Sequence, residues 1–274
     1  MADADSRSPT DPILVSWPRE HVAQMTLNRP DHLNALTLDM VVDIADTLRE
    51  LGDRPACRVI VITGAGRGFC AGLDIPDFLS RTSGRWRGSG ERLDNQERFA
   101  GMVRAVRAVR QPVIAAVNGP VAGAGFGLVL GADVRLASPE ARFHVAAVKI
   151  GLSAGECGIS YHLPRYVGAS RALEIMLTGR PVDAQEADRI GLVSRVVPGD
   201  ELLDAALETA EAISANSPFA VRMTKEVAWA NLDSTLDEAL ALENRTQVLA
   251  VTTRDSQEAM LAFTEKRPPV FTGE

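Results

Sequence analysis

The chain has 274 residues, of which 46% are hydrophobic and 24% charged, an ordinary composition for a water-soluble globular protein. Its formal net charge of −7 argues against nucleic acid as a partner, because a polyanion would be repelled by the overall field. No apolar stretch approaches the roughly 20 residues of a membrane span, and the polar residues 1–10 do not form a signal or transit peptide. We therefore expect a cytoplasmic protein.

The first third of the chain predicts a hairpin and then a helix. Residues 1–12 are polar and predicted to be disordered, whereas residues 13–17 and 21–27 are β-rich runs separated by a short turn. Apolar residues at helical spacing follow Thr37, which is suited to cap the helix, and Gly52 ends it.

Two continuous apolar runs, residues 58–63 and 112–117, predict strands that are buried on both faces. Each run leads into a glycine-rich turn. After the second turn the pattern predicts a helix over residues 123–131 and another strand over residues 133–137. Repetition of strand, glycine turn and helix is typical of a layered α/β fold.

The last third of the chain is mainly helical in pattern. Residues 203–213 form an apolar stripe, and Ser234 with Asp237 predicts a capping box at the start of the next helix. We therefore expect an α/β core over residues 13–199 and a C-terminal helical region over residues 200–274.

The two glycine turns are built from small residues. The first reads FCAGLD over residues 69–74, and the second reads GPVAGAGFG over residues 119–127. Small residues let a ligand approach the backbone closely, and a helix that starts there leaves N–H groups unpaired. Two such turns that direct one N–H each to the same point form an oxyanion hole, which stabilises a carbonyl as it becomes anionic. Either turn alone is better explained as a tight turn that allows a helix to pack closely on a strand.

Other ligand classes are less well supported by the sequence. The glycines of residues 64–68 follow a strand but lack the GxGxxG spacing of a dinucleotide-binding loop. Three cysteines (Cys57, Cys70 and Cys157) and four histidines are scattered without metal-ligand spacing, so no metal is expected.

Four segments resemble motifs of the crotonase superfamily, the enoyl-CoA hydratases and isomerases. NRPDHLNAL over residues 28–36 resembles NRPxxxNAL, residues 69–74 resemble F-x-AGxD, residues 113–125 resemble AAVNGxxxGxG, and residues 262–267 are similar to the closing F-x-EKR. The resemblance implies a crotonase-like spiral of ββα units that forms a homotrimer or a dimer of trimers. It also implies an enzyme whose substrate is an acyl-coenzyme A thioester, with coenzyme A as part of the substrate and no separate cofactor.

Positions carried over from these motifs give the expected site. The resemblance implies that the backbone amides of Leu73 and Ala124 form the oxyanion hole. The substrate-binding positions that it implies are Ala35, Ala71, Gly72, Asp74, Ile75, Gly123 and Lys266. Asp74 would hold the first turn, while Ala71 and Ile75 would line the pantetheine and adenine region.

Residues 80–95 are polar and rich in glycine, and they predict a mobile loop beside the first turn. Arg81, Arg85 and Arg87 in this loop could contact the phosphates of coenzyme A. Such a run of charges is also typical of a solvated surface.

The sequence departs from the hydratases at both of their catalytic glutamate positions. Counting from the second glycine turn places Gly127 at the first position, and counting from Phe143 places Ala147 at the second. Neither residue can exchange a proton, so the standard hydratase mechanism is not expected.

One carboxylate, Glu156, is a candidate replacement. Counted back from the Leu-Pro pair at residues 163–164, it falls where dienoyl-CoA isomerases carry a catalytic aspartate. Among small and apolar residues its carboxyl would be partly desolvated and its pKa raised, which suits a general acid/base. The alternative is a carboxylate at a helix N-terminus, stabilised by the helix dipole and solvent.

These features predict an isomerase-type acyl-CoA enzyme. Leu73 and Ala124 would stabilise a thioester enolate, and Glu156 would move a proton between Cα and Cγ of the acyl group. The alternatives are an acyl-CoA thioester hydrolase that uses the same hole and a catalytically weak acyl-CoA-binding protein.

Overall fold

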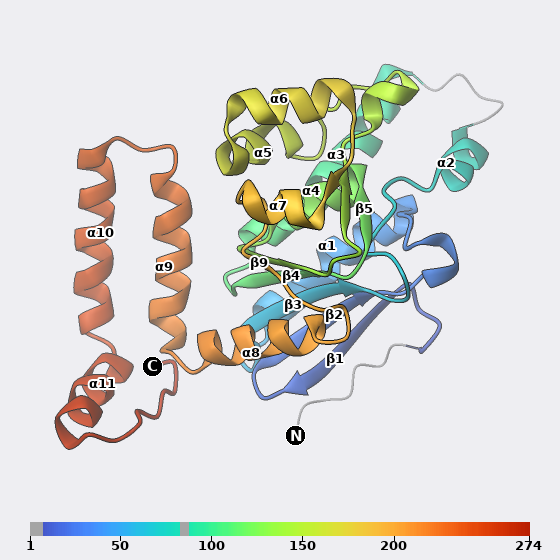
Figure 1. Ribbon diagram of the computed structural model, residues 1–274. Helices are drawn as coiled ribbons and strands as arrows, with labels where there is room; N and C mark the ends of the chain where they lie inside the picture. Colours follow the sequence, from blue (N-terminus) through green and yellow to red (C-terminus); the bar gives the residue numbers. More distant parts are fainter. Residues whose placement is uncertain (1–7, 83–87) are drawn as a thin grey trace.

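The computed structural model describes residues 8–82 and 88–274, and it shows two β-sheets surrounded by helices (Figure 1). Within these residues the larger sheet has the strand order β1 (Ile13–Arg19), β2 (Val22–Leu27), β3 (Val59–Gly64), β4 (Val113–Val117), β6 (Val134–Ala137) and β9 (Arg195–Val196). β1 and β2 form the predicted antiparallel hairpin, and the remaining pairs are parallel. The smaller sheet contains β5 (Pro120–Ala122), β7 (Arg142–His144) and β8 (Val182–Asp183).

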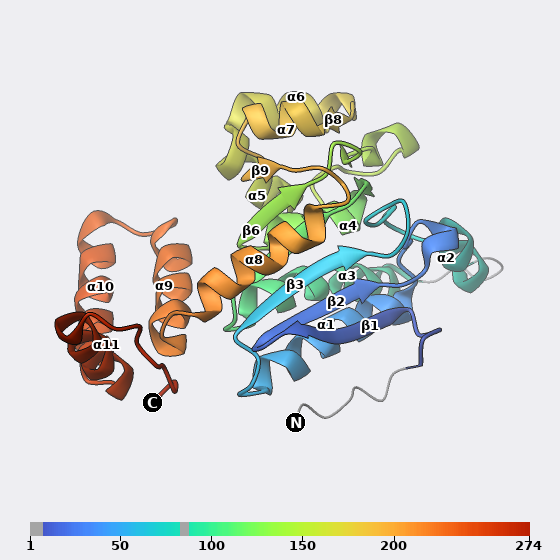
Figure 2. The same cartoon turned by 60° about the horizontal axis from the view of Figure 1, so that its bottom comes forward.

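The central strands are buried on both faces, as the two apolar runs predicted. Successive side chains of a strand point to opposite faces. Ile60 and Ile62 therefore join the main core with α1 (Leu38–Asp53) and α3 (Ser89–Ala108), whereas Val59 and Val61 join a second cluster. This second cluster is closed by α8 (Leu202–Ser214), which crosses the opposite face of the sheet (Figure 2).

The start of α1 confirms the predicted cap. The hydroxyl of Thr37 accepts a hydrogen bond from the Met40 amide at 3.2 Å. Because such a cap supplies an acceptor for one of the unpaired amides of the first turn, the helix begins where the sequence indicated.

The predicted mobile loop over residues 80–95 is largely replaced by helix. α2 (Ile75–Thr82) extends to Thr82, α3 begins at Ser89, and residues 83–87 lie outside the described part of the chain. The first turns of α3 are solvent-exposed. An exposed helix can be polar on all sides there, so polarity alone did not exclude a helix. The predicted disorder of residues 1–12 falls mainly on residues 1–7, which are also outside the described part.

Four further helices lie between β5 and β9 in the chain, and the first of them begins in the second glycine turn. They are α4 (Gly123–Gly131), α5 (Ile159–Val167), α6 (Ala169–Thr178) and α7 (Ala184–Arg189), with short 3₁₀ turns at Pro30–His32 and Ala147–Ile150. The strands β5, β7, β8 and β9 were not predicted, because runs of two or three residues are too short to show a period.

The predicted C-terminal region divides into two parts. α8 packs on the larger sheet through Leu202, Ala206, Leu207 and Ala210. The following helices, α9 (Pro218–Asn231), α10 (Leu236–Val251) and α11 (Arg254–Glu265), project away from the sheets (Figures 1 and 2).

The capping box of α10 lies one residue later than predicted. Thr235 and Glu238, not Ser234 and Asp237, exchange the two reciprocal hydrogen bonds. Ser234 instead donates its hydroxyl to the carbonyl of Ala230 at 2.9 Å, which keeps it with the preceding turn.

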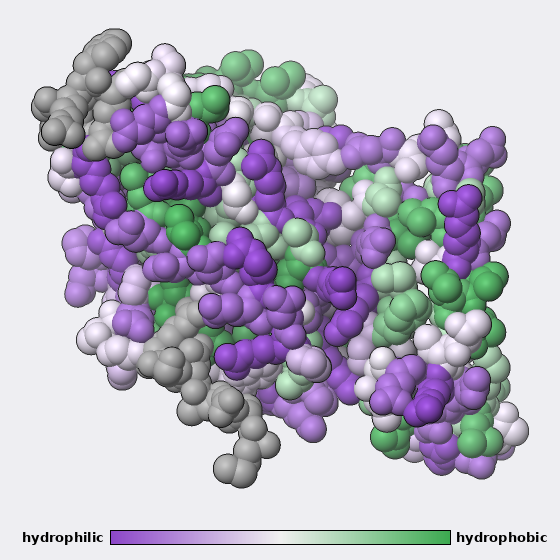
Figure 3. Space-filling model, turned by 180° about the vertical axis from the view of Figure 1, so that it is seen from behind, coloured by the Kyte–Doolittle hydropathy of each residue, from purple (hydrophilic) through white to green (hydrophobic). Residues whose placement is uncertain are grey.

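The projecting helices expose large apolar side chains, and Figure 3 shows green patches on this part of the molecule. α9 and α10 contain no buried residue in the described chain. The exposed apolar residues of α10 and α11 are Leu236, Leu240, Val248, Leu249, Val251, Met260, Leu261 and Phe263. No helix among the described residues is long and apolar enough to cross a membrane.

Candidate functional site

The two glycine turns follow β3 and β4 and contact each other. The Ala122 amide donates to the Cys70 carbonyl at 2.9 Å, and the Cys70 amide donates to the Pro120 carbonyl at 3.3 Å. Gly72 has φ +85°, and a Cβ at this position would lie 2.8 Å from the Ala122 carbonyl oxygen. Only glycine therefore allows the first turn to adopt this conformation and rest directly on the second.

Each turn presents an amide without an acceptor in the described chain. On either side of Leu73, the Gly72 carbonyl accepts from the Leu36 amide, and the Asp74 amide donates to the Leu36 carbonyl. The N–H of Leu73 itself has no acceptor among the described residues. Ala124 is the second residue of α4, whose cap supplies no side-chain acceptor. Amides in the first turn of a helix have no intrahelical partner. The structure thus brings together the two turns that carry the predicted oxyanion-hole amides.

The carboxyl of Asp74 holds the first turn in place. Its Oδ1 accepts from the Asp77 amide at 3.0 Å, and its Oδ2 lies 2.9 Å from Nη1 of Arg29. The Asp77 amide and the Arg29 guanidinium hold the pKa of this buried carboxyl below its usual range. Arg29 also donates to the carbonyl of Ala35, so the segment that contains Ala35 is tied to the same turn.

Asn34 reinforces this arrangement, and its role was not recognised from the sequence. Its side-chain amide donates to the carbonyls of Ala65 at 3.0 Å and Gly68 at 2.8 Å, and its Oδ1 accepts from the Arg29 amide at 2.8 Å. The sequence motif at residues 28–36 contains Asn34, but only the structure shows which backbone groups its side chain binds.

Glu156 lies against the start of α4. A Cβ built on Gly123 would be 3.5 Å from Oε1 of Glu156, which places the carboxyl beside the residue that precedes Ala124. The side chain is half-buried, and burial raises the pKa of its carboxyl. Within the described residues it has no hydrogen-bond or ion-pair partner, so nothing offsets the loss of solvent.

Glu156 is not an N-terminal carboxylate of α5, the helix that follows it in the chain. The cap of α5 is Gly158, two residues later, and the carboxyl accepts no amide of that helix. The helix terminus that the Glu156 carboxyl lies beside is that of α4, at Gly123, and burial there raises its pKa.

The two hydratase glutamate positions lie in packed surroundings. Gly127 is fully buried in α4, where an added Cβ would lie 2.4 Å from the Cys157 carbonyl oxygen. Ala147 opens the 3₁₀ turn after β7 and is 8% exposed.

Of the other predicted substrate positions, Ala71 and Ile75 are exposed beside the first turn. Lys266 is exposed at the end of α11, on the opposite side of the molecule from α2 (Figure 1). A single chain therefore does not bring Lys266 to the glycine turns. The neighbouring Arg267 is held by Glu258 at 2.6 Å and Glu265 at 2.6 Å.

The arginines predicted near coenzyme A phosphates do not form a free cluster in the described chain. Arg81 is paired with Asp39 at 2.6 Å and with Asp77 at 2.9 Å. Arg85 and Arg87 belong to residues 83–87, which the structure does not describe. No group of three or more His, Cys, Asp or Glu among the described residues is placed to hold a metal ion.

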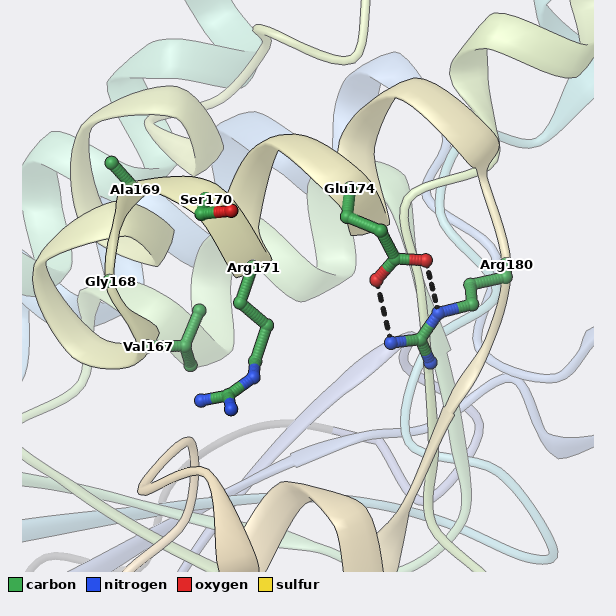
Figure 4. A pocket seen from close by; sticks show the side chains of 7 residues that line it. All are labelled: Val167, Gly168, Ala169, Ser170, Arg171, Glu174 and Arg180. Atoms are coloured by element: carbon green, nitrogen blue, oxygen red, sulfur yellow. Dashed lines mark hydrogen bonds and ion pairs between the residues drawn. The ribbon is translucent and has the colours of Figure 1, made fainter.

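The pocket drawn in Figure 4 has a volume of about 540 Å³ but lies on α5 and α6, away from these turns. It is lined by Val167, Gly168, Ala169, Ser170, Arg171, Glu174 and Arg180. Arg180 is already paired with Glu174 at 2.7 Å and with Glu186 at 2.8 Å, so it offers little free charge to a ligand. The candidate site therefore rests on the glycine turns and Glu156.

Comparison with known proteins identifies the family. The model of the enoyl-CoA hydratase/isomerase family matches residues 18–274. A probable enoyl-CoA hydratase of Mycobacterium tuberculosis, EchA12, is 42% identical over 277 residues, covering 98% of this chain and 95% of the relative. The 1,2-epoxyphenylacetyl-CoA isomerase of Escherichia coli is 36% identical, with 95% and 98% covered.

A solved structure from Streptomyces coelicolor A3(2) has the same fold. It superimposes with a TM-score of 0.91 at 39% identity, covering 100% of both chains. The predicted α/β crotonase fold with C-terminal helices is thereby confirmed. This chain belongs to the enoyl-CoA hydratase/isomerase family, the crotonases, whose members act on acyl-CoA thioesters.

Proposed function

We propose that this family member is an isomerase-type enzyme that shifts a double bond in an acyl-CoA thioester. The observation that carries the proposal is the position of Glu156. Its carboxyl lies beside Gly123, the residue before Ala124, and burial raises the pKa of this carboxyl. A proton-transfer group thus adjoins a site that can stabilise an anion.

The chemistry follows from these two features. The amides of Leu73 and Ala124 donate to the thioester carbonyl, and these bonds strengthen as the oxygen gains negative charge. Glu156 removes a proton from Cα, and the electron pair moves into the carbonyl to give an enolate. The protonated Glu156 then returns the proton at Cγ of a conjugated system, and the double bond moves by one position. A raised pKa helps because the same group must accept and donate the proton.

Standard hydration is the less well supported reaction. It requires two carboxyl groups, one to activate water and one for the proton at Cα, and Gly127 and Ala147 supply neither. Of two similar chains, one is named a probable enoyl-CoA hydratase and the other an isomerase, so the names of relatives include both reactions.

Two alternatives use the same atoms. In a thioester hydrolase, Glu156 would activate water or attack the carbonyl, and the two amides would stabilise the tetrahedral anion. In an acyl-CoA-binding protein, the amides would hold the thioester and Glu156 would have no chemical role.

The deciding experiment is turnover of 2-enoyl, 3-enoyl, 2,4-dienoyl, 3,5-dienoyl and aryl thioesters of coenzyme A in ¹⁸O-labelled water, followed by mass spectrometry. A shifted double bond without oxygen label supports isomerisation. Incorporation of the label supports hydration or hydrolysis, and binding without turnover supports the binding protein.

The Glu156→Gln variant tests the assigned residue. It keeps the size of the side chain but cannot accept a proton, so kcat should fall by about 10²–10⁴-fold with little change in binding of coenzyme A esters. Glu156→Asp, which keeps a carboxyl group, is the matched control and should retain more activity. Equal turnover by Glu156→Gln and the wild type would refute the role of this residue.

We further propose that the chain assembles as a homotrimer or a dimer of trimers through α9–α11. These helices expose a large apolar surface and project from the core. Lys266 would then contact the coenzyme A of a neighbouring subunit. The division at residue 200 is better placed after α8, because α8 packs on the larger sheet.

A further inference from the structure

We propose that Gly127 and Cys157 are positioning residues for the carboxyl of Glu156. The inference rests on the proposed proton transfer by Glu156. It concerns the backbone contact between the segment before α5 and the buried helix α4.

The contact at Gly127 is a backbone contact. A Cβ added there would lie 2.4 Å from the Cys157 carbonyl oxygen and 2.8 Å from the Cys157 Cβ. Separations under about 3 Å do not occur between such atoms, so any side chain at position 127 must displace residue 157 or α4. Residues four apart lie on the same face of a helix. Gly123 and Gly127 therefore lie on one face of α4. Glu156 lies beside this face at Gly123, and Cys157 contacts it at Gly127.

The conformation of Cys157 fixes the direction of this segment. Its φ is +46°, and the following Gly158 has φ +74°. A left-handed conformation is unfavourable for a non-glycine residue, and such strain persists only where the surrounding structure maintains it. Cys157 is 4% exposed, and its Sγ lies 3.9 Å from Nε2 of Gln96 in α3. Packing between α3 and α4 thus holds the left-handed turn that directs Glu156 toward Gly123.

A side chain at position 127 and the observed position of Glu156 therefore exclude each other. The segment that contains Glu156 and Cys157 can approach α4 because Gly127 has no side chain. Introducing a glutamate at position 127 would consequently displace Glu156 instead of adding a second carboxyl group to the site.

The Gly127→Ala variant tests this inference. If the contact positions Glu156, kcat should fall by about 10²-fold, because displacement of a catalytic group by 1 Å can have that effect. KM and the affinity for coenzyme A esters should stay close to those of the wild type, because we expect the segment at residue 157 to move while the buried helix α4, which carries Ala124, stays in place. The acidic limb of the kcat profile should move to lower pH, because a displaced carboxyl regains solvent and its pKa falls.

Gly131→Ala is the matched control in the same helix. A Cβ at Gly131 would lie 3.3 Å from Cγ1 of Val103 and 3.5 Å from the Val106 side chain, whose atoms can shift. This variant should keep the kcat and pH profile of the wild type. A role of Gly127 in packing alone would lower the thermal stability of Gly127→Ala without changing its pH profile.

Thiol labelling gives a readout that does not depend on turnover. The three cysteines are free and buried. In folded Gly127→Ala, peptide mapping should show faster labelling of Cys157 alone, whereas an unfolded variant would label at all three. Wild-type kcat and unchanged labelling of Cys157 in this variant would overturn the inference.

A second pair of variants covers the case in which Gly127→Ala does not fold. Cys157→Val places a β-branched residue where φ is positive, a genuine outlier for that residue type, whereas Cys157→Ala can keep the left-handed turn. Cys157→Val should therefore lose much more kcat than Cys157→Ala, and equal values would overturn the inference. An inactive Glu156→Gln beside a fully active Cys157→Val would refute only the positioning, whereas an active Glu156→Gln would refute the proposed function itself.

Discussion

At the residue scale, Asp74 and Glu156 show how two carboxyl groups near the same turns acquire opposite properties. Asp74 accepts from an amide and pairs with Arg29, so its pKa is lowered. Glu156 is half-buried without a partner in the described chain, so its pKa is raised. The first carboxyl is suited to hold structure as a permanent anion, and the second is suited to exchange a proton.

Replacing Asp74 by Asn should loosen the first glycine turn. The amide group can still accept from Asp77 but cannot pair with Arg29, so we expect a loss of about 1.5–3 kcal/mol of stability. The Leu73 amide belongs to this turn and should be displaced with it, so kcat should fall as well. Urea unfolding and steady-state kinetics measure the two effects.

The matched control is Asp39→Asn, because the Asp39 side chain is 72% exposed and pairs with Arg81. An exposed pair contributes about 0–1 kcal/mol. Similar losses in the two variants would contradict the special role of Asp74. The wild-type contribution of Asp74 should be present above its unfolded pKa of about 3.9 and lost as the pH falls through its lower folded value.

Glu156→Gln should make the folded protein more stable at neutral pH. The folded state raises the pKa of Glu156, so the wild type is relatively more stable below the unfolded pKa of about 4.3. That advantage disappears as the pH rises through the folded pKa, because an unpartnered charge is then buried. Thermal unfolding of both proteins at pH 4 and pH 8 should show a gain for the variant only at the higher pH. A gain of the same size at both pH values would exclude ionisation of Glu156 as its cause.

Counting along the sequence identified Glu156 and the loss of both hydratase carboxylates, but not how these facts are related. The contact between Gly127 and Cys157 joins residues 30 positions apart, and the left-handed φ of Cys157 has no sequence signal, since cysteine does not favour it. Asn34 is a similar case, because its three backbone partners belong to segments that only the fold brings together.

At the element scale, continuous apolar runs predicted the buried strands β3 and β4, and apolar residues at helical spacing predicted α1. The prediction of a mobile loop over residues 80–95 was wrong, because this part of α2 and α3 is helical although it is exposed and polar. The sequence pattern also missed β5, β7, β8 and β9, which have two or three residues each. In these places the conformation is set by neighbouring elements and not by a local pattern.

The capping box of α10 makes a test at this scale. Thr235→Ala removes the hydroxyl that accepts from Glu238, so we expect a loss of about 0.5–2 kcal/mol of stability. Ser234→Ala is the control, since Ser234 lies outside the box and is exposed. Thermal unfolding of the two variants should differ, and a larger effect of Ser234→Ala would restore the original assignment of the box.

At the scale of the whole molecule, the sequence indicated a helical C-terminal region but not its separation from the core. Apolar residues occur in each of the helices α8–α11, yet among these described helices only α8 buries an apolar face on the sheet. An exposed apolar surface of this extent is typical of a subunit interface. The proposed assembly would also explain why Lys266 lies far from the glycine turns of its own chain.

Phe263, which is 86% exposed on α11, offers the test of that assembly. Light scattering of the wild type should give three or six times the chain mass of 29.4 kDa. Burying a phenylalanine contributes about 1.5–3 kcal/mol, and a charge in its place must be desolvated, so Phe263→Glu should shift the protein toward the monomer. Leu177→Glu, at a 72% exposed position on α6, is the control and should leave the mass unchanged. If Lys266 contacts coenzyme A across the interface, the dissociated Phe263→Glu protein should show a raised KM, and Lys266→Ala should raise KM without dissociation. A monomeric wild type, or dissociation by Leu177→Glu alone, would contradict assembly of the subunits through α9–α11.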